Sequence, residues 1–158
     1  MKITFLGHAT LEIQINEFNL LVDPFISGNP MASEINLDDL KPDFILISHA
    51  HQDHTLDVEK LAKDNNSLII SNFEIVSHFQ SKGLNGHPMN HGGKWNFDFG
   101  ELKYVNAIHT STFPDGSNGG QPGGFIITSN NKSIYIAGDT ALTYDMKLIP
   151  INYNLDLA

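Results

Sequence analysis

The sequence predicts a protein of the mixed α/β class, and two recurring residue patterns support this prediction. Short apolar, β-branched runs such as Phe44–Ser48, Leu68–Ile70 and Ser133–Ala137 are typical of buried strands. Apolar residues recur at helical spacing after Thr55 and again after Ser71, which indicates helices between strands. Periodicity alone supports mixed α and β structure and no finer architecture.

Length and composition predict one domain over residues 1–158. With 41% hydrophobic residues, the chain can bury one ordinary core. No segment approaches the roughly 20 apolar residues that a membrane span needs, and the N-terminus lacks the pattern of a signal peptide. There is no cysteine, so any metal ligands must be nitrogen or oxygen. We therefore expect a cytoplasmic protein without a membrane partner.

The charge balance argues against nucleic acid as a partner. The formal net charge is −9, and all nine basic residues are lysine. A net negative surface repels phosphate backbones, and the lack of arginine removes the usual bidentate clamp for carboxylate or phosphate. The composition favours a small neutral or weakly charged substrate, while the possibility of a homo-oligomer stays open.

The N-terminal part reads as three strands over Ile3–Leu6, Leu11–Ile15 and Phe18–Val22. His8 lies between the first two strands, and by sequence alone it is more often a structural histidine than a ligand. Asp23 follows the third strand. It either ends that strand before a proline or orients a metal-bound histidine through the free ring N–H.

The chemistry is concentrated in His49-Ala50-His51-Gln52-Asp53-His54, directly after a buried strand and before a helix expected to begin near Thr55. Imidazole nitrogens and carboxylate oxygens suit zinc and its first-row neighbours. Alternate residues of an extended segment point the same way, so His49 and His51 can share one ion. The following turn lets Asp53 and His54 reach a second ion. The competing interpretation is a solvated polar loop rich in histidine.

The next helix has a capping-box pattern, with Ser71 followed three residues later by Glu74. It should end near Gly83, a glycine of the kind that caps helix C-termini. We interpret His78, within this helix, as structural. The residues expected to face the core are Ile75, Val76 and Phe79.

A hairpin is predicted over Trp95–Phe99 and Leu102–Asn106, where apolar residues alternate. Its second strand leads to His109, the best candidate for the third ligand of the first ion. His87 and His91 lie in sequences typical of turns. They belong either to the wall of the site or simply to those turns.

The last third of the chain begins with the glycine-rich stretch Ser111–Gly124, which has no apolar period and should be a mobile segment bordering the substrate. Phe125–Thr128 and Ser133–Ala137 are strands joined by an Asn-Asn hairpin turn. Asp139 follows the second strand. From the residues alone, it is a helix N-cap for Ala141–Ile149.

His-x-His-x-Asp-His after an apolar strand resembles the signature of the metallo-β-lactamase superfamily. The remainder is similar to the branch of small bacterial metal-dependent hydrolases. The matching pieces, in the order of the family and spread over nearly the whole chain, are Phe5-Leu6-Gly7-His8, Asp23-Pro24-Phe25, the histidine cluster, His109 and Gly138-Asp139-Thr140. The resemblance implies a four-layer αββα sandwich, incomplete here at its C-terminus.

The resemblance also implies a binuclear site with two divalent ions, zinc first and manganese or iron(II) as alternatives. Its implied ligands are His49, His51 and His109 for ion one, Asp53 and His54 for ion two, and Asp139 as the bridge. A bridging hydroxide would attack a small ester, lactone or phosphoester. Asp53 and His54 are the implied catalytic residues, with Asp53 orienting the hydroxide. Lesser candidates near substrate or ligands are His8, Asp23 and His91.

Resembling proteins continue for several elements beyond this chain and supply one more histidine for ion two. Residues 155–158 read as the start of a buried strand, so we expect a truncated chain. Alternatives on the same scaffold are a lactonase, a phosphodiesterase or nuclease, and a di-iron redox protein. Redox relatives usually carry glutamate where this chain has His51, which favours hydrolysis. A metal-binding protein without turnover is the alternative of another class.

Overall fold

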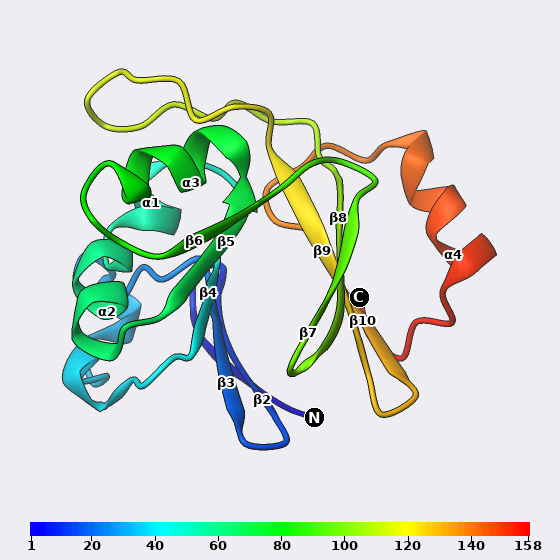
Figure 1. Cartoon of the computed structure of the whole chain (residues 1–158), viewed down its shortest axis with the longest axis horizontal. Helices are drawn as coiled ribbons and strands as arrows, with labels where there is room; N and C mark the ends of the chain where they lie inside the picture. Colours follow the sequence, from blue (N-terminus) through cyan, green and yellow to red (C-terminus); the bar gives the residue numbers. More distant parts are fainter.

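Two β-sheets pack face to face in the computed structural model, which describes residues 1–158, and helices lie on the outside (Figure 1). The first sheet contains β1 (Lys2–Gly7), β2 (Thr10–Ile15), β3 (Phe18–Val22), β4 (Phe44–Leu46), β5 (Leu68–Asn72) and β6 (Gly86–Met89). The second contains β7 (Lys94–Phe97), β8 (Gly100–Asn106), β9 (Gly123–Ser129) and β10 (Lys132–Ile136). The helices are η1 (Pro30–Ala32), η2 (Leu37–Asp39), α1 (Gln52–Thr55), α2 (Val58–Asn65), α3 (Phe73–Gln80), η3 (Tyr144–Leu148) and α4 (Ile149–Asn152).

The first sheet is mixed and the second is antiparallel. Strands β1 to β3 pair antiparallel, and β3 to β6 pair parallel in chain order. The second sheet has the order β10-β9-β8-β7, with every pair antiparallel. Parallel strands end at the same edge of a sheet, so the segments that follow β3, β4 and β5 meet there. Asp23, the histidine cluster and the start of α3 are therefore brought together.

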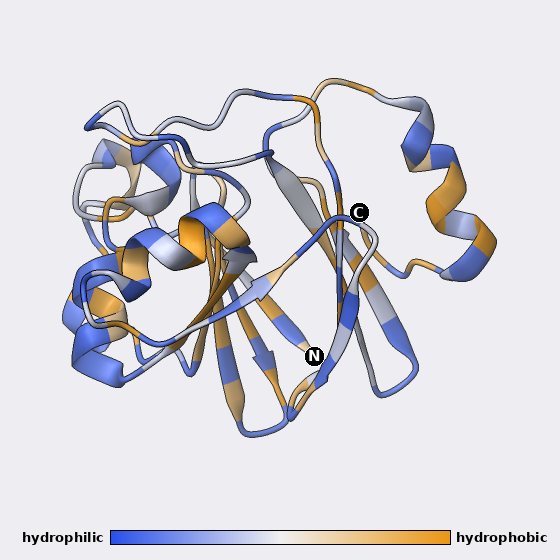
Figure 2. Cartoon of the chain, turned by 45° about the horizontal axis from the view of Figure 1, so that its top comes forward, coloured by the Kyte–Doolittle hydropathy of each residue, from blue (hydrophilic) through white to orange (hydrophobic).

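The first sheet is apolar on both faces because it separates two cores. One core of 14 buried residues lies between the sheets, and another of 14 lies between the first sheet and the α2–α3 layer. In β3, Leu20 and Val22 face the first core and Leu21 faces the second, as the period of two requires. Figure 2 shows apolar residues along these strands, and η3 and α4 lie outside the second sheet. This is the αββα order of layers.

Several predicted elements are confirmed, including the three N-terminal strands, the β7–β8 hairpin and the turn at Asn130 and Asn131, whose φ angles are +53° and +59°. Positive φ at both central residues is typical of the turn that joins such hairpins. No helix has the length and apolar character needed to cross a bilayer.

Two predictions in the middle of the chain are wrong. Asn72, not Ser71, caps α3, because its Oδ1 accepts the Ile75 N–H at 2.9 Å. The Ser71 hydroxyl is buried and instead donates to the Ile47 carbonyl at 2.6 Å. The turn predicted around His87 is the strand β6, which pairs parallel with β5 at the edge of the sheet. A proline at this position is tolerated because β6 is an edge strand.

The region after β10 also differs from the prediction. Residues 141–143 are irregular, the cap of η3 is Thr143, and Asp139 caps no helix. Near the end of the chain, Leu157 forms an isolated parallel bridge with Ile134, and its carbonyl accepts the Tyr135 N–H at 2.9 Å. Leu157 is 53% exposed, so the segment predicted to begin a buried strand forms only an isolated bridge to β10 and is not buried.

Candidate metal centre

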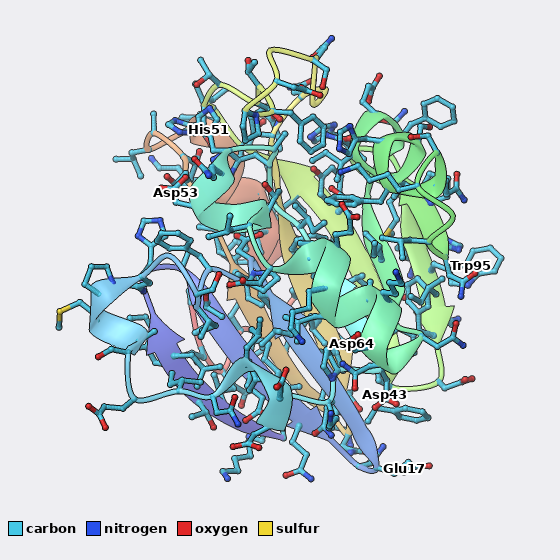
Figure 3. The ribbon with its side chains drawn as sticks, turned by 90° about the vertical axis from the view of Figure 1, so that its left-hand side faces the viewer. Glu17, Asp43, His51, Asp53, Asp64 and Trp95 are labelled. Carbon is cyan, nitrogen blue, oxygen red and sulfur yellow. The ribbon has the colours of Figure 1, made fainter.

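The histidine cluster connects the end of β4 to α1. His49 is fully buried directly after the strand, and His51 is the N-cap of α1. The single helix predicted to begin near Thr55 is two helices: α1 is one turn that begins at Gln52, and α2 begins at Val58. Asp53 and His54 therefore lie in α1. Figure 3 shows His51 and Asp53 at one end of the molecule, opposite the β2–β3 turn marked by Glu17.

The first group consists of His49, His51 and His109, whose ligand atoms lie within 4.8 Å of one another. His49 Nε2 and His51 Nδ1 are 3.0 Å apart, and the His109 ring lies 5.0 Å from the His49 ring and 5.1 Å from the His51 ring. The hairpin strand β8 ends at Asn106, so His109 reaches the group from the loop that follows. The structure thus brings together the three residues expected at ion one.

The second group consists of His8, Asp53 and His54, also within 4.8 Å of one another. His8 Nε2 lies 3.1 Å from Asp53 Oδ2, and the His8 and His54 rings are 5.1 Å apart. His8 has a φ of +54° in the turn between β1 and β2. The distances place His8 beside Asp53 and His54.

Asp139 lies between the two groups. Its Oδ1 is 3.6 Å from His54 Nε2, and its Oδ2 is 3.7 Å from His109 Nε2. The preceding Gly138 has a φ of +64°, and a Cβ at that position would lie 2.7 Å from the Ser48 Cβ. Only glycine allows this approach, which places the carboxylate beside the end of β4.

Nε2 of His54 provides a test of whether these residues suit a metal ion. This atom is buried and has no hydrogen-bond partner. An unpaired buried polar group costs about 1–3 kcal/mol, and 3.6 Å to Asp139 is too long for a hydrogen bond. A divalent cation held by imidazole and carboxylate would satisfy it, and both ligand types suit zinc, manganese or iron. The residues fit a metal centre.

Asp23 fixes the orientation of the His54 ring through a contact with its Nδ1. Its carboxylate is buried and accepts the Ser48 N–H at 2.7 Å and the Ser48 hydroxyl at 2.6 Å. One of its oxygens also lies 3.0 Å from His54 Nδ1. A hydrogen bond at Nδ1 leaves Nε2 free to bind a metal, the arrangement common among metal-bound histidines.

The pKa values of the site follow from burial and close charges. Burial, and then the neighbouring imidazole of His54, lowers the pKa of His49 to about 3, so that this ring is neutral near pH 7. Burial alone would lower the pKa of His54, but the hydrogen bond and charge of Asp23 raise it overall. Burial would raise the pKa of Asp53, whereas the charge of His54 lowers it overall. Neutral imidazole and ionised carboxylate are the metal-binding forms.

The remaining histidines lie away from both groups. His91 Nε2 lies 2.8 Å from the Pro122 carbonyl oxygen, and its ring contacts Tyr104. His87 packs against aromatic side chains of β7. His78 stacks on Phe113 at 3.9 Å between ring centroids, as expected for a structural residue.

The sequence did not predict the roles of three residues that support the site. Ser48 contacts both Asp23 and the Nδ1 of His49, at 3.0 Å. The buried Asp57 carboxylate accepts the backbone N–H groups of Ile26, at 2.6 Å, and Ser27, at 3.0 Å, and so holds the loop after β3. Ser111 accepts the N–H of a residue inside the histidine cluster. Only the position of Ser48 beside the cluster was a sequence signal, because the other contacts join residues 30 or more positions apart.

Comparison with known proteins identifies the family of this chain and finds a similar fold among solved structures. A family model described as "Beta-lactamase superfamily domain" matches residues 18–158. A "UPF0173 metal-dependent hydrolase" of Flavobacterium johnsoniae is 63% identical over 158 residues, which is all of this chain and 70% of that protein. One of Christiangramia forsetii is 60% identical, with 100% and 70% coverage. Igni18, a metallo hydrolase of Ignicoccus hospitalis, is 30% identical with a TM-score of 0.83, and the match covers 96% of this chain and 66% of Igni18.

Proposed function

Because the chain belongs to the β-lactamase superfamily and, within it, to the metal-dependent hydrolases of the UPF0173 type, we propose that it hydrolyses a small ester, lactone or phosphoester at two divalent ions. The observation that carries this proposal is the buried, unpaired Nε2 of His54, whose ring belongs to the second group and also lies within ligand distance of His49 and Asp139. Zinc is the proposed metal, with manganese and iron(II) as alternatives. His49, His51 and His109 would hold one ion, Asp53 and His54 the other, and Asp139 would contact both.

The residues of the chain have distinct roles in this proposal. Bound divalent ions lower the pKa of water from about 15.7 to about 7 and so supply a nucleophile near neutral pH. Asp53, ionised and half-buried, would accept a hydrogen bond from that nucleophile and orient it. Asp23 keeps the His54 ring in place. No arginine is present to clamp a phosphate, which favours an ester or lactone over a phosphoester.

The first prediction concerns metal content. His51→Ala removes a ligand from the first group, so it should lose about one ion per chain and lower hydrolysis at least 100-fold. Elemental analysis and a panel of p-nitrophenyl acetate, a γ-lactone and bis-p-nitrophenyl phosphate measure both. His87→Ala, which alters a histidine outside the site, is the control. Unchanged metal stoichiometry in His51→Ala would refute the ligand assignment, and metal binding without hydrolysis of any ester would favour a non-catalytic role.

The second prediction concerns Asp139. Asp139→Asn keeps the shape of the side chain and removes its charge, so the second ion should be lost first and turnover with it. Equilibrium dialysis against zinc measures occupancy, and the same panel measures turnover. Asp145→Asn changes an exposed carboxylate that accepts a hydrogen bond from Asn106, and should alter neither. Full occupancy and full turnover in Asp139→Asn would contradict the bridging role.

We also propose that the protein works in the cytoplasm. The absence of cysteine is compatible with a reducing compartment, and the small substrate requires no membrane partner.

A further inference from the structure

Two hydroxyls join the two segments that carry the first group: the exposed Thr110 Oγ1 lies 3.2 Å from His51 Nε2, and the Ser111 hydroxyl forms the buried link. Ala50 lies between His49 and His51, and its backbone N–H donates to Ser111 Oγ at 3.1 Å. Ser111 is two residues beyond His109 and is 8% exposed. Its hydroxyl in turn donates to the Gly119 carbonyl at 3.1 Å. The hydroxyl is therefore satisfied as both acceptor and donor.

Gly119 and Asn72 also fix the position of the Ser111 hydroxyl, because Asn72 holds Gly119 and Gly119 accepts the hydrogen bond of that hydroxyl. The Gly119 N–H donates to the Ser111 carbonyl at 2.9 Å, and a Cβ at position 119 would lie 2.1 Å from the Ala50 Cβ. Asn72, 4% exposed, donates from Nδ2 to the carbonyls of Gly119 at 2.7 Å and Gln121 at 3.0 Å. Its Oδ1 also caps α3, so the chain of contacts ends on a helix.

His109 has few contacts of its own that would fix its position. Its side chain is 37% exposed, and Asp139 at 3.7 Å is beyond hydrogen-bond distance. The residues flanking it are held instead. On one side, the Ile108 carbonyl accepts the Ala141 N–H at 3.0 Å, which ties His109 to the segment of Asp139. On the other side, Ser111 ties it to Ala50.

We propose that Ser111 is a positioning residue, which sets the separation of His109 from His49 and His51 and so determines the metal affinity of the first group. This inference rests on the proposed metal centre. Zinc–nitrogen bonds are confined to about 2.0–2.1 Å. A shift of the loop that carries His109 by a fraction of an ångström therefore weakens the binding of zinc by the first group. Residues that orient ligands without touching the ion contribute about 10–100-fold to metal affinity.

The experiment compares Ser111→Ala with a control on the same loop. Ser117→Ala removes a hydroxyl that is exposed and donates only to Asp115, at 2.6 Å. Zinc affinity is measured by competition with a chelator at a temperature where circular dichroism shows both variants folded. The Co²⁺ absorption spectrum reports ligand geometry independently of activity. If Ser111→Ala does not fold, Ser111→Gly, which also removes the hydroxyl and adds no metal ligand, replaces it.

Ser111→Ala should bind zinc at least 10-fold more weakly than wild type and show an altered Co²⁺ spectrum. Ser111→Thr, which keeps the hydroxyl, should recover most of the affinity, and Ser117→Ala should match wild type. A Ser111→Ala variant that is less stable but binds zinc within twofold of wild type would overturn the positioning role and leave the proposed function standing. A wild-type chain that takes up no zinc would overturn the proposed function and, with it, this role.

Discussion

His54 illustrates how much of a site depends on partners far away in the sequence. The ring is fixed through Nδ1 by Asp23, 31 residues earlier, while Nε2 remains unpaired. The spacing of the cluster predicts that His54 is a ligand candidate. The spacing does not predict which ring nitrogen faces the site, because the carboxylate that contacts Nδ1 belongs to Asp23, which follows β3.

His78 leads to a prediction about pH. Partial burial, and then the ammonium of Lys82, lowers the pKa of this histidine from 6.5. The folded state therefore binds fewer protons than the unfolded state. The contribution of His78 to the free energy of unfolding is full above pH 6.5 and is lost as the pH falls through the lowered folded-state pKa.

Replacing His78 by glutamine should make the fall in stability between pH 7.5 and pH 5 shallower. Urea unfolding followed at a series of pH values measures the change, with the metal-free protein used throughout so that ligand binding does not contribute. An identical slope in the two proteins would show that His78 is not linked to folding.

At the residue scale, the sequence predicts which imidazole and carboxylate side chains come together, and it does not predict the residues that support them. The six residues from His49 to His54, together with His109 and Asp139, lie in the segments that follow β4, β8 and β10, and the fold brings these segments together. Asp57 and Ser111 are ordinary polar residues by sequence. Their importance comes from backbone N–H groups on other segments, which no local pattern reveals.

At the scale of elements, the start of α3 has two functions at once. The Asn72 side chain caps the helix through Ile75 and holds two carbonyls of the glycine-rich loop. Asn72→Ala loses a cap, worth about 1 kcal/mol, and leaves the buried Gly119 carbonyl without this donor, at about 1–3 kcal/mol. The free energy of unfolding should fall by about 3 kcal/mol, measured by chemical denaturation.

Asn36→Ala is the matched control for that prediction. Asn36 is exposed and caps only η2, where its Oδ1 accepts the Asp38 N–H at 3.2 Å. The Asn36→Ala substitution should lower the free energy of unfolding by about 1 kcal/mol or less. Equal losses in the two variants would mean that the loop contacts of Asn72 contribute nothing to stability.

Elements were predicted best where burial reinforces the local pattern. Strands such as β3 and β5 are apolar on both faces, so their runs are unambiguous. β6 was missed because Gly86 and Pro88 are typical of turns, and it forms a strand only through its pairing with β5. The helix predicted after Asp139 was misplaced because no residue of η3 or α4 is buried, so no apolar face fixes where it begins.

At the scale of the whole molecule, the two sheets share one core, and the first sheet shares the other core with the helices. Neither sheet can lose its partner without exposing apolar surface, so unfolding should occur in one transition, in line with the expected single domain. Zinc at 100 times its Kd should add about 2.7 kcal/mol of stability and raise the Tm by roughly 2–4 °C per kcal/mol.

Scanning calorimetry of the metal-free and zinc-loaded chain measures both effects. Two resolved transitions in the metal-free protein would contradict the shared-core explanation, whereas a Tm independent of zinc would contradict the metal centre. His51→Ala, which should keep one of the two ions, is examined in parallel and should show the single transition with a smaller zinc-dependent shift.

The glycine-rich loop between β8 and β9 extends over α3 (Figure 1), and its contacts bear on the rate of turnover. The sequence predicts a mobile segment here. In the structure, however, Phe113 is buried against His78, and Asn72 holds the carbonyls of Gly119 and Gln121. Loops that open and close limit kcat in many enzymes. We expect that a loop anchored on α3 at these positions acts as a fixed wall, so that the entry of substrate and the release of product do not wait for a gate to open.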